Sequence, residues 1–215
     1  MRFICLFALA IALSAQTTAP APDASKGLPP RASAAEYQGH AKAGNMTIAA
    51  DFTQHAVSTA EGTLTTEDYV VVEVALFGDP GARTTVSVTD FSLRINGNKK
   101  LLPSVPYGMV VANLKDPDYV APEEKAAKEK KSSSLSTGGE GGGGGNDPPP
   151  IIHIPLEVQR SWAKRVQTDA IPEGDRPLPI AGLIFFHYTG RAKNVHTVDL
   201  VYAGPAGKAT VTLAP

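Results

Sequence analysis

Apolar and polar residues alternate with a period of two over much of this chain, as they do in β-strands that bury one face. The clearest run is YVVVEVALF at residues 69–77, in which Glu73 lies on the face opposite the even-numbered apolar residues. MTIAADF at residues 46–52 alternates in the same way. Both runs predict half-buried strands.

The run TTVSVTDFSLRI at residues 84–95 changes phase, because its apolar residues move from even to odd positions at Thr89 and Asp90. One extra residue would restore the inward face, so we predict a β-bulge or a break there. Two turns are also predicted from their residues. Asp79-Pro80-Gly81 suits a type II turn, and NGNK at residues 96–99 suits a hairpin turn.

The C-terminal part predicts further strands and one helix. IAGLIFFHY at residues 180–188 is apolar on both faces, which is typical of a central strand, whereas residues 195–203 and 208–214 alternate. Between residues 157 and 170, apolar side chains recur every four residues, which predicts a short helix. Trp162 belongs to this stripe, so we expect it in the core rather than exposed as a platform for stacking sugars. The predicted interior consists of Val70, Val72, Val74, Leu76, Phe91, Leu93, Ile184, Phe186, Leu200, Val211 and Leu213.

A segment of low complexity interrupts these strands. Residues 116–150 contain a dense run of charges, then polyglycine and three prolines, a composition that cannot form a core. About four strands are predicted before it and about three after it, and neither set alone could bury both faces of a sheet. We therefore predict one all-β domain at residues 45–215, a β-sandwich of about seven strands with one short helix, interrupted by a disordered insertion at 116–150. The alternative is that the glycine run links two domains.

The N-terminus has the order of a secretory signal peptide: Arg2, an apolar run at residues 3–12, and then small residues. We predict a signal peptide at residues 1–15 with cleavage after Ala15; Ala12 and Ala19 are alternative sites, and a retained anchor is the alternative interpretation. Residues 16–44 are rich in Ala, Pro, Ser and Thr and predict a flexible leader. The protein is accordingly expected to be exported to the periplasm, the cell envelope or the extracellular space.

Composition narrows the candidate chemistry. Cys5 is the only cysteine and lies in the predicted signal, so the mature chain offers no disulfide, cysteine-ligated zinc or cysteine nucleophile. The whole chain has 20 basic and 21 acidic residues, and loss of Arg2 leaves 19 basic residues against 21. Nothing in this balance indicates a nucleic acid or an anionic membrane as partner, and no membrane span is expected in the mature chain.

No catalytic, cofactor-binding or metal-binding residue is assigned from the sequence, and no cofactor is expected. His187 and His196 fall on strands that are expected to be neighbours, and together with Asp90 they could form a site from residues distant in sequence. Alone, Asp90 is expected to accept backbone N–H bonds at the bulge or turn. Asn45 begins NMT, which fits the pattern of a glycosylation acceptor.

Several motifs resemble a known family. Val72 and Val74, the stretch from Asp90 to Leu93 with Gly97 after it, Pro172–Gly174, and Gly182–Phe185 are similar to motifs in small immunoglobulin-like domains of exported bacterial proteins, including the secreted mycobacterial antigen type. The resemblance covers roughly half of the chain and implies an immunoglobulin-like fold and an envelope location, without catalytic residues. We therefore expect a non-catalytic envelope protein, a binding, adaptor or structural domain with an unknown partner. The alternative is a metal-binding protein or hydrolase whose site includes His187, His196 and Asp90.

Overall fold

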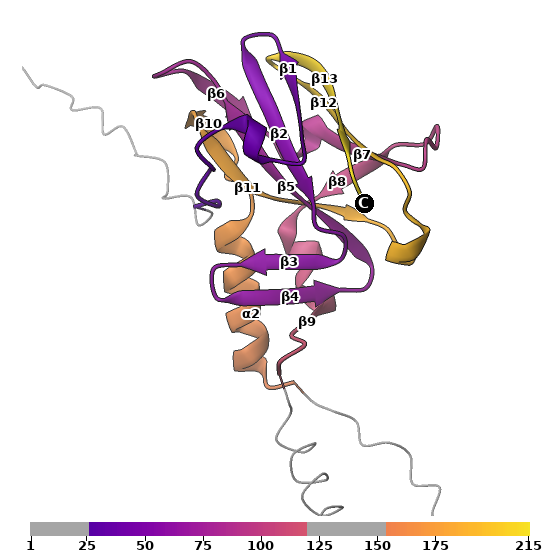
Figure 1. Ribbon diagram of the computed structural model, residues 1–215. Coiled ribbons are helices and arrows are strands. Elements are labelled where there is room, and N and C mark those ends of the chain that lie inside the picture. Colours follow the sequence, from indigo (N-terminus) through magenta and orange to yellow (C-terminus); the bar gives the residue numbers. More distant parts are fainter. Residues whose placement is uncertain (1–25, 120–153) are drawn as a thin grey trace, which may run out of the picture.

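The computed structural model describes residues 26–119 and 154–215, which are mostly β-strand (Figure 1). The strands are β1 (Gly39–Ala43), β2 (Met46–Phe52), β3 (Ala56–Thr59), β4 (Gly62–Thr66), β5 (Tyr69–Phe77), β6 (Arg83–Val86), β7 (Phe91–Ile95), β8 (Leu102–Val105), β9 (Leu114–Lys115), β10 (Gly174–Pro177), β11 (Ile180–His187), β12 (Val198–Gly204) and β13 (Gly207–Leu213). The helices are α2 (Leu156–Asp169) and the 3₁₀ turns η1 (Ala34–Glu36), η2 (Val88–Asp90), η3 (Tyr107–Met109), η4 (Val111–Asn113) and η6 (Ala192–Asn194). The prediction of a mostly β chain with a short helix is confirmed, and the alternation in the sequence accounts for about seven of these strands.

Eight strands form one antiparallel sheet in the order β1-β2-β5-β11-β8-β7-β12-β13. Strands from before and after residues 120–153 are interleaved in this order, because β11 lies between β5 and β8 and β12 lies beside β7, so both parts of the chain contribute to one sheet and one core. The residues predicted to fill the interior all belong to the main buried cluster, and this prediction is confirmed. Among the described residues, no helix is long and apolar enough to cross a membrane.

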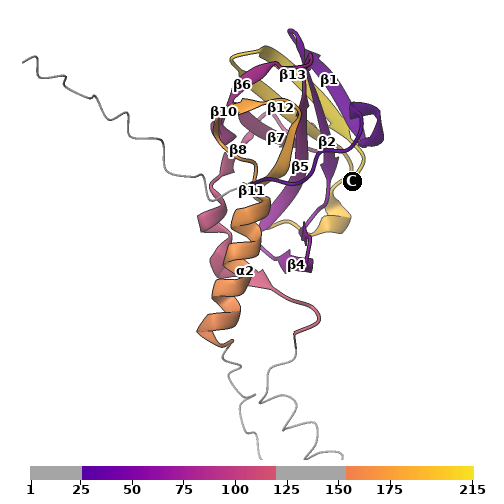
Figure 2. The same ribbon diagram turned by 90° about the vertical axis from the view of Figure 1, so that its left-hand side faces the viewer.

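The sheet curls until its first and last strands lie side by side, which makes it nearly barrel-like (Figures 1 and 2). Gly39 on β1 shows how closely they approach, since a Cβ there would lie 2.5 Å from the carbonyl oxygen of Thr212 on β13. No β-ladder joins β1 to β13 within the described part of the chain. The two edge strands therefore lie close together at this seam without a ladder of backbone hydrogen bonds.

A second layer covers the outer face of β5 and β11. The helix α2 packs there together with the small sheet β3-β4-β9, and Trp162 and Val166 face this second cluster with 4% and 0% exposure. Figure 2 shows α2 alongside this lower part of the molecule. Both β5 and β11 are thus buried on two faces, which explains why residues 180–188 are apolar throughout. The predictions for the helix and for Trp162 as a core residue are confirmed.

The N-terminal segment differs from the expectation of a flexible leader up to residue 44. Residues 39–43 form β1, and Leu28 pairs with Ala181 outside the named strands. Tyr37 packs with Ala181 in a third buried cluster over the outer face of the sheet. The sequence pattern did not predict that this segment is ordered, because backbone hydrogen bonds and an ion cluster hold the segment in place rather than an alternating apolar face.

That ion cluster also changes the interpretation of Glu73. Its face of the sheet is covered rather than open to water, and its side chain is 16% exposed. Asp51 and Glu73 are direct partners on β2 and β5, and the Arg31 guanidinium contacts the carboxylates of both. Like charges opposite one another in a sheet repel, so Arg31 compensates for a pair that would otherwise be unfavourable.

The predicted turns are present. The N–H of Ala82 donates to Asp79 at 2.9 Å, and Gly81 has φ +81°, as a type II turn requires. The phase change at Thr89 and Asp90 is a break, because η2 separates β6 from β7. The signal peptide, residues 16–25 of the leader and residues 120–150 of the insertion lie outside the described residues.

Candidate functional site

Two loops distant in sequence meet at one end of the curled sheet. The first, called here the β7–β8 loop, comprises residues 96–101, and the second, the β11–β12 loop, comprises residues 188–197. Both project from the same side of the molecule in Figure 1. Asn96 and Gly97 have φ values of +54° and +67°, in the left-handed region that asparagine and glycine tolerate best. This local preference turns the chain sharply after β7.

Asn96 joins the two loops. Its side-chain oxygen accepts hydrogen bonds from the N–H groups of His196 and Thr197 at 2.7 and 3.3 Å. Its side-chain nitrogen donates to the carbonyl of Asn194 at 2.7 Å, and its backbone N–H donates to Thr197 at 2.8 Å. One residue therefore satisfies four backbone groups of the β11–β12 loop and fixes the position of this loop against the β7–β8 loop.

The other end of the β11–β12 loop is held as well. The N–H of Tyr188 donates to the carbonyl of Asp68 at 2.8 Å. The ring nitrogens of His55 lie 2.8 Å from the Tyr69 carbonyl oxygen and 3.1 Å from that of Gly190. Within the loop, Val195 is buried in the main core with 5% exposure. The loop is anchored at its start, middle and end, so the backbone that carries its exposed side chains is held in place.

An open groove of about 330 Å³ lies beside this junction. It is lined by Ile95, Asn96, Asn98, Lys100, Leu102 and Tyr188. The lining thus combines two amides, an ammonium group, an aromatic ring and two aliphatic side chains. Such a mixture can form hydrogen bonds with a polar ligand and pack against its apolar surface.

The charged side chains of the two loops have one sign. Lys99, Lys100, Arg191 and Lys193 are all exposed, and residues 95–102 and 188–198 contain no Asp or Glu. The sequence did not reveal this patch, because its four cations are divided between two short segments in a chain of nearly zero net charge. The absence of acidic residues from both loops was visible in the sequence, but it indicates a basic patch only once the two loops are known to be adjacent.

The structure does not bring His187, His196 and Asp90 together. His187 ends β11, whereas His196 precedes β12, and β8 and β7 separate those strands in the sheet. The prediction that the two histidines occupy neighbouring strands is therefore wrong. His187 contacts the ring of Tyr69 edge-on, with ring centroids 5.5 Å apart. No group of three or more potential ligands is found within residues 26–119 and 154–215.

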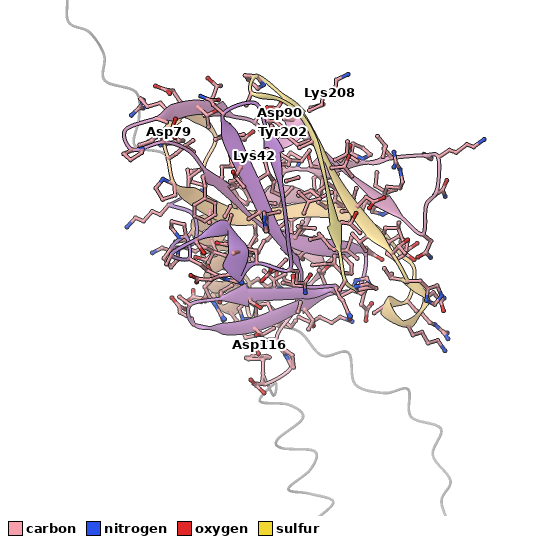
Figure 3. All side chains as sticks on the ribbon, turned by 45° about the horizontal axis from the view of Figure 1, so that its top comes forward. Lys42, Asp79, Asp90, Asp116, Tyr202 and Lys208 are labelled. Atoms are coloured by element: carbon pink, nitrogen blue, oxygen red, sulfur yellow. The ribbon has the colours of Figure 1, made fainter. Side chains whose placement is uncertain are left out.

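Asp90 lies at the other end of the molecule's curled sheet, beside Tyr202 (Figure 3). In that view Lys208 extends away from the molecule, while Asp90 and Tyr202 lie next to one another. The expectation that Asp90 accepts backbone N–H bonds is not met, because within the described residues no backbone N–H donates to its carboxylate. At this turn the hydroxyl of Ser87 accepts from the N–H of Thr89. Burial raises the pKa of Asp90, and the nearby carboxylate of Glu173 raises it further.

A second polar pocket, of about 340 Å³, lies between α2 and the β3–β4 turn. Asp169, which is 7% exposed, accepts a hydrogen bond from the N–H of Ala60, and burial raises its pKa. Arg165 donates to the hydroxyl of Thr59 at 2.9 Å and to the carbonyl of Gly62 at 3.0 Å. These contacts hold the turn against the helix, which is a structural task. Asn45 is exposed in the turn between β1 and β2.

Comparison with protein-family models, with curated proteins and with solved structures finds no match for this chain. The resemblance to exported immunoglobulin-like domains therefore stays a prediction.

Proposed function

We propose that this protein is an exported, non-catalytic binding domain of the cell envelope that contacts its partner at the groove between the β7–β8 and β11–β12 loops. The observation that carries the proposal is the junction at Asn96, which bonds to residues about a hundred positions away in the sequence. Loops on a rigid sheet are common binding elements. Because these loops are fixed before binding, a ligand would not have to order them, and this lowers the entropic cost of association.

The export part of the proposal rests on the order of charged, apolar and small residues at the N-terminus. The mass of the intact protein isolated from the envelope fraction tests it. We expect a mass that lacks residues 1–15, and a mass that includes them would contradict cleavage. The immunoglobulin-like sandwich is likewise a proposal: the mostly β chain supports it, and the nearly barrel-like curl of the sheet is a departure from two separate facing sheets.

The binding site can be tested by placing a photo-crosslinking amino acid at Asn98, which is exposed and lines the groove. The matched control carries the same group at Thr210, which is exposed on β13 and does not line this groove. We expect irradiation in envelope extracts to give a discrete adduct from position 98 and none from position 210. The Asn96→Gly substitution should reduce the yield of the adduct from position 98, because glycine tolerates the positive φ but cannot form the side-chain hydrogen bonds of Asn96. Equal adducts from both positions, or none from position 98, would contradict the proposal.

A further inference from the structure

The two loops that meet beside the groove carry four cations, of which Lys100 lines it, and these cations are not neutralised by their own loops. Lys99 and Lys100 lie in the β7–β8 loop, Arg191 and Lys193 lie in the β11–β12 loop, and neither loop contains an acidic residue. The adjacent Arg94 is different, because it lies 3.7 Å from a carboxylate oxygen of Asp199. Charges of one sign gathered around a concave surface raise the local concentration of ions of the opposite sign. The groove therefore favours an anionic ligand.

The residues that line the groove can contact a ligand larger than a single anionic group. Asn98 accepts a hydrogen bond from the N–H of Lys100 at 3.1 Å, and its side-chain amide also has two N–H donors. The half-buried Tyr188, whose ring stacks with that of His55, and the half-buried Leu102 provide apolar surface, whereas Ile95 is 7% exposed and provides little. Sugars present both hydroxyl groups, which pair with amides, and C–H faces, which pack against apolar and aromatic groups. An open groove of about 330 Å³ can accept one or two sugar rings of a longer chain.

A membrane surface fits these observations less well. Peripheral binding to a bilayer usually combines cations with exposed apolar side chains that enter the interface. In the described part of the chain, the large apolar side chains with the greatest exposure are Met109 at 57% and Leu156 at 58%. They belong to η3 and to the start of α2, and not to the basic loops. The basic end thus lacks the apolar side chains that would anchor it in lipid.

We propose that the groove binds an acidic polysaccharide, a sugar chain that bears carboxylate, phosphate or sulfate groups. The sugar rings lie against Tyr188 and the amide of Asn98, and the acidic groups lie among Lys99, Lys100, Arg191 and Lys193. This inference rests on the proposed function, because it uses the same groove and names its ligand.

The test measures binding of the full mature chain to polygalacturonate, a carboxylated polysaccharide, by titration at several salt concentrations. Neutral dextran, inorganic polyphosphate and vesicles that contain phosphatidylglycerol are the comparison ligands. We expect binding to polygalacturonate that weakens as salt increases, and weaker binding to the other three. Lys99→Glu/Lys100→Glu should weaken binding at least about tenfold, because each lysine near a polyanion contributes on the order of a fivefold factor.

The matched control is Lys42→Glu/Lys208→Glu, which changes the net charge equally at two exposed lysines outside the groove. It should retain the affinity of the wild type, and thermal melts should show that both double variants are folded. The inference is overturned if the control loses as much affinity as the groove variant, if polyphosphate or the vesicles bind as tightly as polygalacturonate, or if polygalacturonate does not bind. If position 98 gives an adduct but polygalacturonate does not bind, the groove remains the proposed binding site and the acidic polysaccharide is rejected as its ligand. Absence of both would remove the proposed function as well.

Discussion

Replacing Arg31 with alanine should destabilise the fold by about 2–3 kcal/mol at neutral pH. Arg31 contacts the carboxylates of Asp51 and Glu73, donates to the carbonyl of Glu36 at 2.6 Å, and lies 4.2 Å from the centre of the Tyr37 ring. Without it, two carboxylates that are direct partners on adjacent strands lose their shared cation. The N-terminal segment also loses its main polar attachment to the sheet.

The magnitude follows from the burial of the three charges. Removing one partner of a fully buried ion pair costs about 3–5 kcal/mol, whereas an exposed pair contributes about 0–1 kcal/mol. The side chains of Asp51 and Glu73 are 15% and 16% exposed, but Arg31 is 33% exposed, so the ionic loss lies between these limits. Loss of the cation–π contact adds roughly 0.5–1 kcal/mol.

The effect should depend on pH. Burial raises the pKa of Glu73, the Asp51 carboxylate also raises it, and Arg31 lowers it, so the pKa should rise further in Arg31→Ala. A carboxyl group whose pKa is raised on folding contributes stability below its unfolded pKa of about 4.3, and this stability is lost as the pH rises through the folded value. The deficit of the variant should therefore be largest near pH 7 and should shrink as the solution becomes acidic.

Urea denaturation of the wild type, Arg31→Ala, Glu73→Gln and the double variant, at about pH 7 and pH 4, measures these differences. The double variant should recover much of the loss at pH 7, because one of the two unpaired carboxylates is gone. A loss below about 0.5 kcal/mol, or an equal loss at both pH values, would refute the electrostatic account of this cluster.

Three further predictions concern the core, the turn at η2 and one close approach of the backbone. Val72→Asp and Val211→Asp should each abolish cooperative unfolding of the whole mature chain, seen by circular dichroism, because a buried charge costs several kcal/mol against a total of about 5–15 kcal/mol. Asp90→Asn should raise the melting temperature at pH 7 by roughly 2 °C, because the raised pKa of Asp90 means that its charged form is disfavoured in the fold. The gain should vanish below about pH 3.9, where the carboxyl group is protonated in both states, and a gain that persists there would contradict this electrostatic explanation. Gly182→Ala should cost about 1–3 kcal/mol in urea denaturation, because its Cβ would lie 2.5 Å from the backbone nitrogen of Ile171. The control Gly108→Ala, with no atom within 4 Å of its Cβ, should cost less than about 0.5 kcal/mol, and equal losses would refute the steric argument.

The features that local chemistry determines could be predicted from the sequence. Alternation identified the faces of β5, β12 and β13, and the inward residues Val72, Leu200 and Val211 were correct. The period of four identified α2, and the turn residues at 79–81 and 96–99 identified two changes of direction. Each of these signals lies within about a dozen residues, where side-chain period and backbone preference dominate.

The site depended on strand order, which local patterns do not encode. Whether His187 approaches His196, or Lys99 approaches Lys193, depends on which strands are neighbours, and the sequence interpretation brought the wrong pair together. Strand β1 and the Arg31 cluster were missed for a related reason, because this segment is ordered by contacts with residues far along the chain. The alternating pattern thus determined which residues are buried. Only the long-range pairing of the strands, the sum of many weak contacts between distant segments, determined that two loops carrying four cations meet beside one groove.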